Sequence, residues 1–399
     1  MKKILFAINT LGRAGAEVAL LELIRSIDEK EYEIYLYVVM GQGEVIREIP
    51  DYVKVLNSSF DAISVLSAQG KKQMKKNVRK LMFRNGSIFK NFIYVLDNGL
   101  RMIFKGKIAK DKLLWKVLSD GGEFFDEEFD LAVAYLEGGS TYYVRDHVKA
   151  KKKVAFVHVD YSMAGYNRRL DKNVYLDYDK IFTVSSEVAD SFTKVYEELK
   201  SRTEVFNNII NKQYILDKSK ENYGFTDDFD GVRLLTVGRL TAQKALQVSV
   251  EACNLLKKRG ANIRWYVLGE GDQRKKLEKL IRKKKLEKDF ILCGAVENPY
   301  TYMLNCDIIV HESRYEGKSI AIQEAQILGK PIIVSDCNGN REQVIHDIDG
   351  IMCGFDSLEL CKSIERLIVD NELRDRIGEK AREKNTQTDE TCKMLELIE

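Results

Sequence analysis

The sequence lacks a long uninterrupted hydrophobic run, and this excludes a typical membrane-spanning protein. No apolar stretch approaches the roughly 18 residues that a spanning helix needs. The opening "MKKILFAINTLGRAGAE" begins with two lysines, as a secretion signal does, but its apolar part ends at Asn9 and no cleavage site follows. We interpret it as a first β-strand and expect the protein to remain in the cytoplasm.

Cysteine is missing from the first half of the chain. All seven cysteines lie in the second half, and they show neither a C-x-x-C spacing nor neighbouring histidine pairs. This pattern argues against a zinc site or a dithiol redox motif. We expect reduced and mostly buried thiols at positions 253, 293, 306, 337, 353, 361 and 392.

The chain also lacks a large net charge, because its formal charge is only +3. Its 399 residues, 45% hydrophobic and 31% charged, suit two globular domains. The charge is unevenly distributed. Segment 71–117 holds 14 basic and 2 acidic residues (+12), whereas the rest of the chain holds 50 basic and 59 acidic residues (−9). One basic segment therefore lies in an otherwise acidic protein.

Short apolar runs alternate with amphipathic stretches in both halves, which is typical of parallel β-α units. The expected strands are "KILFAI", "YEIYLYVV", "DLAVAYL", "KKVAFVHV" and "KIFTVS" in the first half and "VRLLTVG", "IRWYVLG", "FILCG", "CDIIVHES" and "PIIVSD" in the second. The pattern predicts an α/β protein of two doubly wound, Rossmann-like domains that face an interdomain cleft.

We predict the domain boundaries from the same pattern. An N-terminal domain covers 1–207 and includes the basic amphipathic segment 71–117. A linker region of weak periodicity covers 208–230, and a second domain covers 231–385. We expect a C-terminal helix, 386–399, to pack back on the first domain.

Two glutamates, Glu316 and Glu324, flank the start of a predicted helix in "RYEGKSIAIQEAQILGKPIIVSD". At helical rise they are separated by about 12 Å along the axis. The first free N–H groups of the helix make an anion site between them, so a diphosphate could bind there with a sugar on one side and a ribose on the other. The alternative is a loop acid and a helix acid at a chance spacing. The amides concerned belong to Lys318, Ser319 and Ile320.

Two cations, Arg239 and Lys244, follow the first strand of the second domain in "TVGRLTAQKAL". They can converge on the same phosphates, or they can be solvated surface charges. Glycines end the next two strands in "VLGEGDQ" and "CGAVENPY", where they either admit a ligand to the backbone or simply make turns.

Taken together, "GRL…QK", "LGEG", "EG…E" and "GKPIIVSD" resemble the ordered motifs of the retaining family-4 glycosyltransferases of the GT-B fold. The resemblance implies that Glu316 lies at the donor sugar as a catalytic residue, and that Glu324 holds the ribose. It places Arg239 and Lys244 at the diphosphate and backbone near Gly294 at the base. It also implies donor contacts from Gly317, Lys318, Ser319 and Ile320.

The first domain is similar to the same family at three strand ends. "NTLGRAGAEVAL" resembles its glycine-rich loop, with Ala14 in place of one glycine and the donor-binding Gly15 kept. His158 in "VAFVHVDYS" stands where the family has a catalytic histidine that faces the donor sugar; a structural histidine is the alternative. "AYLEGG" places Glu137 and Gly138 on the acceptor side, as in a branch that builds bacterial surface polysaccharides, although Glu137 is equally compatible with a turn acid.

Besides Ala14, three residues depart from the family pattern. Ala245 stands where a glycine often follows the lysine, and Lys318 and Ser319 replace the usual aromatic residue and glycine. The backbone amides survive these changes, and Lys318 adds a third cation.

We therefore expect a retaining glycosyltransferase that moves a hexose or N-acetylhexosamine from a nucleotide-diphosphate sugar, with UDP as the nucleotide, to a hydroxyl acceptor. The setting is surface polysaccharide or lipid-linked oligosaccharide assembly. We expect no cofactor, no nucleic acid and no metal. We assign neither "DYD" (177–179) nor "DID" (347–349) to a metal ion. A nicotinamide cofactor is excluded because the G-x-G-x-x-G spacing is missing. A non-catalytic nucleotide-sugar-binding subunit and a GT-B-type epimerase are the alternatives.

The basic segment contains two apolar stripes at helical spacing, separated by Asn85 and Gly86. Both stripes can pack on the sheet of the first domain. Alternatively, both can lie on an anionic membrane, which would make the protein peripheral on the inner face of the cell membrane. The stripes comprise Met74, Val78, Leu81 and Met82, and then Phe89, Phe92, Ile93, Leu96, Leu100 and Ile103.

Overall fold

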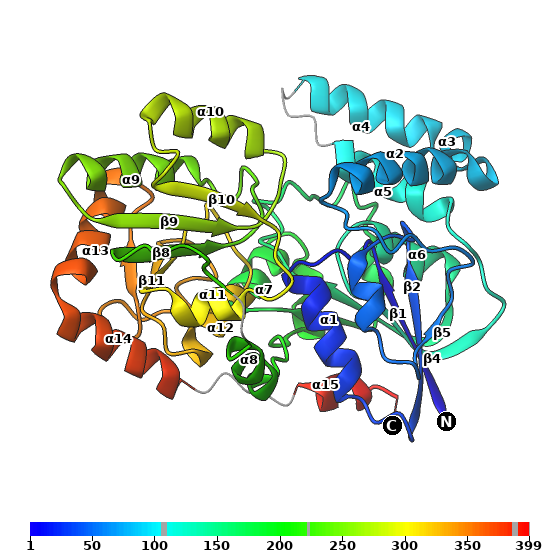
Figure 1. Ribbon diagram of the computed structural model, residues 1–399. Coiled ribbons are helices and arrows are strands. Elements are labelled where there is room, and N and C mark those ends of the chain that lie inside the picture. Colours follow the sequence, from blue (N-terminus) through cyan, green and yellow to red (C-terminus); the bar gives the residue numbers. More distant parts are fainter. Residues whose placement is uncertain (105–109, 222–223, 385–389, 399) are drawn as a thin grey trace. The chain divides into compact units, whose positions relative to one another are not determined.

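A computed structural model describes residues 1–104, 110–221, 224–384 and 390–398. The chain divides into two compact units (Figure 1), and the second runs from Ile210 to Gln387. The first unit combines Met1–Ile209 with Thr388–Glu399. Parts of three predicted segments lie outside the described residues, namely 105–109 of the basic segment, 222–223 of the linker region, and 386–389 and 399 of the C-terminal helix.

The first unit is built on a seven-stranded parallel sheet in the order β3-β2-β1-β4-β5-β6-β7. Its central strands are continuous apolar runs because helices cover parallel sheets on both faces; the last five residues of β1 are buried completely. The strands are β1 (Lys2–Ile8), β2 (Tyr32–Val38), β3 (Lys54–Val55), β4 (Glu128–Ala134), β5 (Lys149–Val157), β6 (Lys180–Thr183) and β7 (Thr203–Val205).

Eight α-helices surround this sheet in the described part of the unit, with four short 3₁₀ helices between them. The α-helices are α1 (Gly15–Ser26), α2 (Ala68–Phe83), α3 (Ser87–Lys90), α4 (Phe92–Phe104), α5 (Lys110–Asp120), α6 (Gly139–His147), α7 (Ser186–Thr193) and α15 (Thr391–Leu395). The 3₁₀ helices are η1 (Glu44–Glu48), η2 (Arg84–Gly86), η3 (Val174–Asp177) and η4 (Glu197–Arg202).

The second unit has a six-stranded parallel sheet in the order β10-β9-β8-β11-β12-β13. Its strands are β8 (Val232–Val237), β9 (Ile263–Leu268), β10 (Phe290–Gly294), β11 (Ile308–His311), β12 (Ile332–Ser335) and β13 (Ile351–Cys353). Its helices are α8 (Lys212–Ser219), α9 (Gln247–Lys258), α10 (Arg274–Lys284), α11 (Tyr300–Asn305), α12 (Ile320–Ile327), α13 (Ser357–Val369) and α14 (Asn371–Glu383).

Both sheets reverse their strand order once, and the two doubly wound α/β units predicted from the sequence are confirmed. The reversal lies between β1 and β4 in the first unit and between β8 and β11 in the second, where Leu235 pairs with Ile309. Open α/β sheets bind their ligands at the carboxyl ends of such neighbouring strands. The loops after these four strands are therefore the first places to look for a site.

The described C-terminal residues lie against the first unit. The hydroxyl groups of Ser26 and Thr391 are 2.8 Å apart, and Lys393 Nζ donates to the carbonyl oxygen of Val205 at 2.9 Å. Asn207 donates to Glu390 at 2.7 Å. These bonds attach α15 to elements that precede it by more than 180 residues.

Candidate functional site

The loops after β8 and β11 meet at the strand reversal of the second sheet. They bring Lys244 and Glu316 together, with Nζ and Oε1 2.5 Å apart although the two residues are 72 positions apart in sequence. Two further hydrogen bonds join the loops, from the Arg314 amide to the Gln243 carbonyl (2.9 Å) and from the Gln243 side chain to the Tyr315 carbonyl (2.8 Å). The structure therefore makes neighbours of two residues that the sequence assigned to phosphate and sugar.

His311 completes this group, and the sequence interpretation missed it. Its buried Nε2 lies 3.1 Å from Lys244 Nζ. Burial, and then the charge of Lys244, lower the pKa of His311, so the neutral ring accepts a hydrogen bond from the lysine. Burial would raise the pKa of Glu316, yet the charge of Lys244 holds it below its usual range. The place of His311 at a strand end, five residues before Glu316, was the available signal.

Arg239 lies in the same loop as Lys244. Its side chain is exposed, and it makes no hydrogen bond or ion pair with any part of the chain that the structure describes. Gly269 packs closely against this loop. Its φ is +151°, and a Cβ there would lie 1.9 Å from the carbonyl oxygen of Gly238. Gly294, at the end of β10, has a φ of +85° and accepts a hydrogen bond from the Gly269 amide at 2.7 Å. These glycines bring three loops close together at the same edge of the sheet.

The start of α12 differs from the expectation at one amide. The N–H group of Ser319 was expected to be free for an anion, but it donates to Gln343 Oε1 at 2.7 Å, and Gln343 Nε2 donates back to the Ser319 carbonyl at 2.8 Å. Gln343 comes from the segment between β12 and β13, and no sequence motif marks it. The backbone of Gly317 packs against Gly339, since a Cβ on Gly339 would lie 2.0 Å from the carbonyl oxygen of Gly317.

Glu324 is buried in the second turn of α12, beneath this start. It accepts a hydrogen bond from the hydroxyl group of Tyr300, on α11, at 3.0 Å. Burial raises the pKa of Glu324 to about 7. The pKa values of Glu316 and Glu324 are therefore shifted in opposite directions, because the first has a lysine partner and the second accepts from a neutral hydroxyl group. Lys318 and Ile320 flank Ser319 at the beginning of the helix.

In the first unit the candidate residues follow β1, β4 and β5. Gly15 is the first residue of α1. Glu137 Oε1 accepts hydrogen bonds from the backbone N–H groups of His158 (2.6 Å) and Val159 (3.0 Å), so the loops after β4 and β5 are joined. Burial raises the pKa of Glu137, although these amides favour the charged form. Asn9 connects the loop after β1 by donating to the Glu137 carbonyl at 2.8 Å.

The imidazole of His158 is neutral. Its ring lies beside Tyr135 and Phe156, with centroids 4.9 and 5.9 Å away, and burial lowers its pKa to about 4. Its Nε2 atom is buried and has no hydrogen-bond partner among the described residues. A buried nitrogen of this kind is a hydrogen-bonding group in need of a partner.

Gly138 shapes the same loop of the first unit. Its φ is +87°, and a Cβ on it would lie 2.7 Å from Cδ1 of Trp115. Only glycine fits both the backbone conformation and the contact with the indole ring. The glycine is therefore needed where α6 begins.

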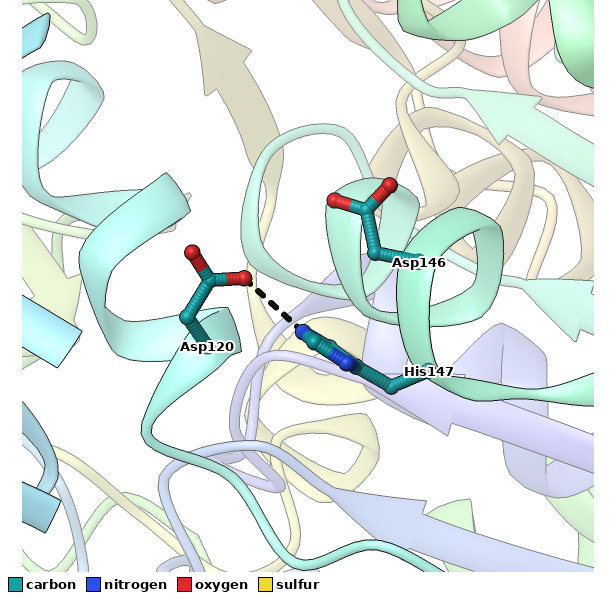
Figure 2. A group of neighbouring side chains, drawn as sticks. All are labelled: Asp120, Asp146 and His147. Atoms are coloured by element: carbon teal, nitrogen blue, oxygen red, sulfur yellow. Dashed lines mark hydrogen bonds and ion pairs between the residues drawn. The ribbon is translucent and has the colours of Figure 1, made fainter. Parts of the chain in front are cut away.

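Asp120, Asp146 and His147 form the single cluster of metal-ligating side chains within the described ranges (Figure 2). His147 Nε2 lies 2.8 Å from Asp120 Oδ1. Lys116 Nζ lies 2.5 Å from Asp120 and 3.1 Å from Asp146, so a lysine ammonium already supplies the cation between the two carboxylates. This network joins α5 to α6, and we propose no metal ion there.

Residues 227–384 match the family model described as glycosyl transferases group 1. The chain is 32% identical over 165 residues to an alpha-D-kanosaminyltransferase of Streptomyces kanamyceticus, covering 41% of this chain and 42% of the relative. It is 25% identical over 162 residues to a poly(ribitol-phosphate) alpha-N-acetylglucosaminyltransferase of Staphylococcus aureus, covering 40% and 33%. The chain thus spans less than half the length of these curated relatives.

The solved structure of Anabaena Alr3699/HepE in complex with UDP-glucose shares the fold, with a TM-score of 0.69 at 16% identity over 100% of this chain and 98% of the other. The predicted GT-B fold is therefore confirmed, and the family resemblance extends to the match of residues 227–384. None of the described helices combines the length and apolar character that crossing a bilayer requires.

Proposed function

Because residues 227–384 match the family model described as glycosyl transferases group 1, we propose that the protein is a retaining glycosyltransferase. It moves a hexose or N-acetylhexosamine from a nucleotide-diphosphate sugar, with UDP as the nucleotide, to a hydroxyl acceptor. The observation that carries this proposal is the contact of Lys244 with Glu316 at the strand reversal. Arg239 lies on the same loop as Lys244 and is the second cation of this proposal.

Lys244 serves the donor diphosphate in this proposal. A lysine ammonium has three N–H donors. One reaches Glu316 and one reaches His311, which leaves one for a phosphate oxygen. Arg239 adds a second cation, and the charge that develops on the leaving diphosphate is met without a metal ion. His311 and Glu316 hold the lysine in place.

Glu316 acts at the donor sugar and Glu324 at the ribose. Glu324 accepts hydrogen bonds from ribose hydroxyls best as a carboxylate. Because its pKa is about 7, it changes from the neutral acid to the carboxylate near neutral pH. Backbone near Gly294 is assigned to the base. Gly317, Lys318, Ser319 and Ile320 remain proposed donor contacts, although the Ser319 amide already has Gln343 as its partner.

The first unit supplies the remaining proposed residues. Glu137 and Gly138 belong to the acceptor side, and Gly15 to donor binding. His158 is proposed to face the donor sugar, where its unpartnered Nε2 can bond to a sugar hydroxyl. Since its pKa is lowered to about 4, His158 acts as a neutral hydrogen-bonding group rather than as a cation.

The acceptor is proposed to be a growing surface polysaccharide or a lipid-linked oligosaccharide on the cytoplasmic face of the cell membrane. The name of the Staphylococcus relative supports this setting, since its acceptor is a poly(ribitol-phosphate). The UDP-glucose complex of the Anabaena neighbour supports UDP as the nucleotide.

A screen of UDP-, GDP- and ADP-sugars for hydrolysis or transfer tests the proposal, with product configuration read by NMR and each assay repeated in excess chelator. We expect turnover of a UDP-sugar, retained anomeric configuration and no loss in chelator. An inverted product would refute retention, and a loss restored by magnesium or manganese would refute metal independence. Binding of UDP-sugars without any turnover would favour the non-catalytic subunit.

A further inference from the structure

Helix α4 is amphipathic, but it packs on the first unit by its polar side and exposes its apolar side. Its buried positions are Tyr94 and Asn98. Its apolar side chains face outward, with Ile93 81% and Phe104 87% exposed. Together with Phe89 of α3, they recur every three or four residues and form one stripe. We call this stripe the α4 face; it consists of Phe89, Phe92, Ile93, Leu96, Leu100, Ile103 and Phe104.

Hydrogen bonds from the polar side fix this orientation. The Tyr94 hydroxyl donates to the Leu170 carbonyl at 3.0 Å, and Asn91, just before the helix, donates to Asp120 at 2.7 Å. Asn98 donates to the Tyr94 carbonyl at 3.0 Å. Rotating α4 to bury its apolar face would break the first two bonds, so the outward orientation is built into the unit.

The apolar stripe of α2 behaves differently. Leu81 is buried with Met40 and Leu118, and Met74, Val78 and Met82 pack against them. The packing interpretation is therefore right for α2 and wrong for the α4 face. Single exposed apolar residues are ordinary in soluble proteins, but a continuous stripe of seven marks an interaction surface.

The segment that carries the α4 face is also strongly basic. Six exposed basic residues line α2, and none of them makes an ion pair with another described residue. Asp97, the acidic residue of α4, is already paired with Arg101 (3.0 Å) and Arg169 (2.8 Å). The six, called here the α2 cations, are Lys71, Lys72, Lys75, Lys76, Arg79 and Lys80.

We infer that the α4 face inserts into the interface of an anionic membrane, with the α2 cations directed to the lipid headgroups. A nucleic acid would match the cations but not the apolar stripe, and an apolar protein groove would match the stripe but not a segment of charge +12. An anionic bilayer offers both partners. The inference goes beyond the proposed reaction and does not depend on it, because the surface is defined without reference to the donor.

Flotation of the full-length protein with phosphatidylcholine vesicles, with and without about one-third phosphatidylglycerol, tests this inference at about 0.05 M and about 0.5 M salt. The first variant combines Ile93→Ser, Leu96→Ser and Ile103→Ser. Its matched control changes three exposed apolar residues of the second unit, Ile345→Ser, Ile348→Ser and Val369→Ser. The second variant changes the α2 cations to glutamine. Its control changes five lysines and one arginine of the second unit to glutamine, at Lys275, Lys276, Lys279, Arg282, Lys283 and Lys288.

We expect wild-type protein and both controls to bind the anionic vesicles at low salt and to lose at least about tenfold in affinity at high salt. The α4 variant should bind at least about tenfold more weakly at both salt concentrations, and the α2 variant should lose both affinity and salt dependence. Circular dichroism confirms that each variant is folded. Absence of wild-type binding at low salt would overturn the inference. So would a solution dimer that the α4 variant converts to a monomer, because the face would then join two copies.

Discussion

At the scale of single residues, Glu316 and Glu324 illustrate how surroundings separate two identical side chains. Lys244 keeps Glu316 charged, whereas burial against a tyrosine hydroxyl brings the pKa of Glu324 to about 7. The pKa values of two chemically identical groups eight positions apart are thereby shifted in opposite directions.

The kinetic consequence is that Glu316→Gln and Glu324→Ala impair different steps. Glu316→Gln should lower turnover by about a hundredfold with little change in UDP affinity, because its partner is the sugar. Glu324→Ala should weaken UDP binding by about tenfold, since it removes the ribose contact. Calorimetry with UDP and a turnover assay measure both, with the exposed Glu287→Gln as control. Wild-type behaviour of both variants would remove the site assignment.

Glu324 should also make stability depend on pH. Its pKa rises from an ordinary 4.5 to about 7 on folding, so the folded chain keeps this proton between those values while the unfolded chain has lost it. The contribution of Glu324 to stability is therefore present at low pH and falls as pH rises through this window, by at most about 3 kcal/mol.

Glu324→Gln has no such proton to lose. Its denaturation midpoint should rise relative to wild type between about pH 5 and about pH 8. Urea unfolding of both proteins across that range checks this expectation, and Glu287→Gln should follow wild type throughout. Parallel profiles for Glu324→Gln and wild type would show that Glu324 has no raised pKa.

At the scale of elements, the turn from β4 into α6 is fixed by Gly138, whose φ is positive and whose missing side chain admits Trp115. Gly165 has nearly the same φ, +85°, but nothing lies within 4 Å of a Cβ built there. Comparing substitutions at the two glycines therefore distinguishes the cost of the positive-φ backbone from the cost of the contact with Trp115.

Gly165→Ala should lower the free energy of unfolding by about 1–2 kcal/mol, for the left-handed backbone alone. Gly138→Ala should lower it by a further 1–3 kcal/mol or so, because the new methyl group collides with the indole ring. Denaturation of both variants gives the comparison, and Gly138→Ala combined with Trp115→Leu should recover the second part. Equal losses for the two single variants would mean that Trp115 moves aside freely.

At the scale of the whole molecule, the two units share one architecture but differ in what they present. Both sheets reverse order once. The second unit holds the proposed phosphate-binding cations in the loop after β8, while the first unit carries the basic helices and the α4 face. A net charge of +3 hides this division, because +12 in one segment is nearly balanced by −9 elsewhere. Salt-sensitive vesicle binding is the measurable consequence at this scale.

The sequence by itself determined the two doubly wound units, because apolar runs and turn residues are local signals that specify strands and helices directly. It also placed Arg239, Lys244 and Glu316 on loops at strand ends. It did not reveal the contact of Lys244 with Glu316 and His311, or the pairing of Gln343 with Ser319, since both join residues far apart in the chain.

The tertiary structure alone decided between the two apolar stripes. The α2 and α4 stripes both recur at helical spacing, so periodicity predicts an apolar face for each. Whether that face is buried depends on what lies opposite it. Leu118 and Met40 cover the α2 stripe, whereas Leu170 and Asp120 bind the polar side of α4 and turn its apolar side outward. Periodicity identifies a face, but only the folded chain supplies its partner.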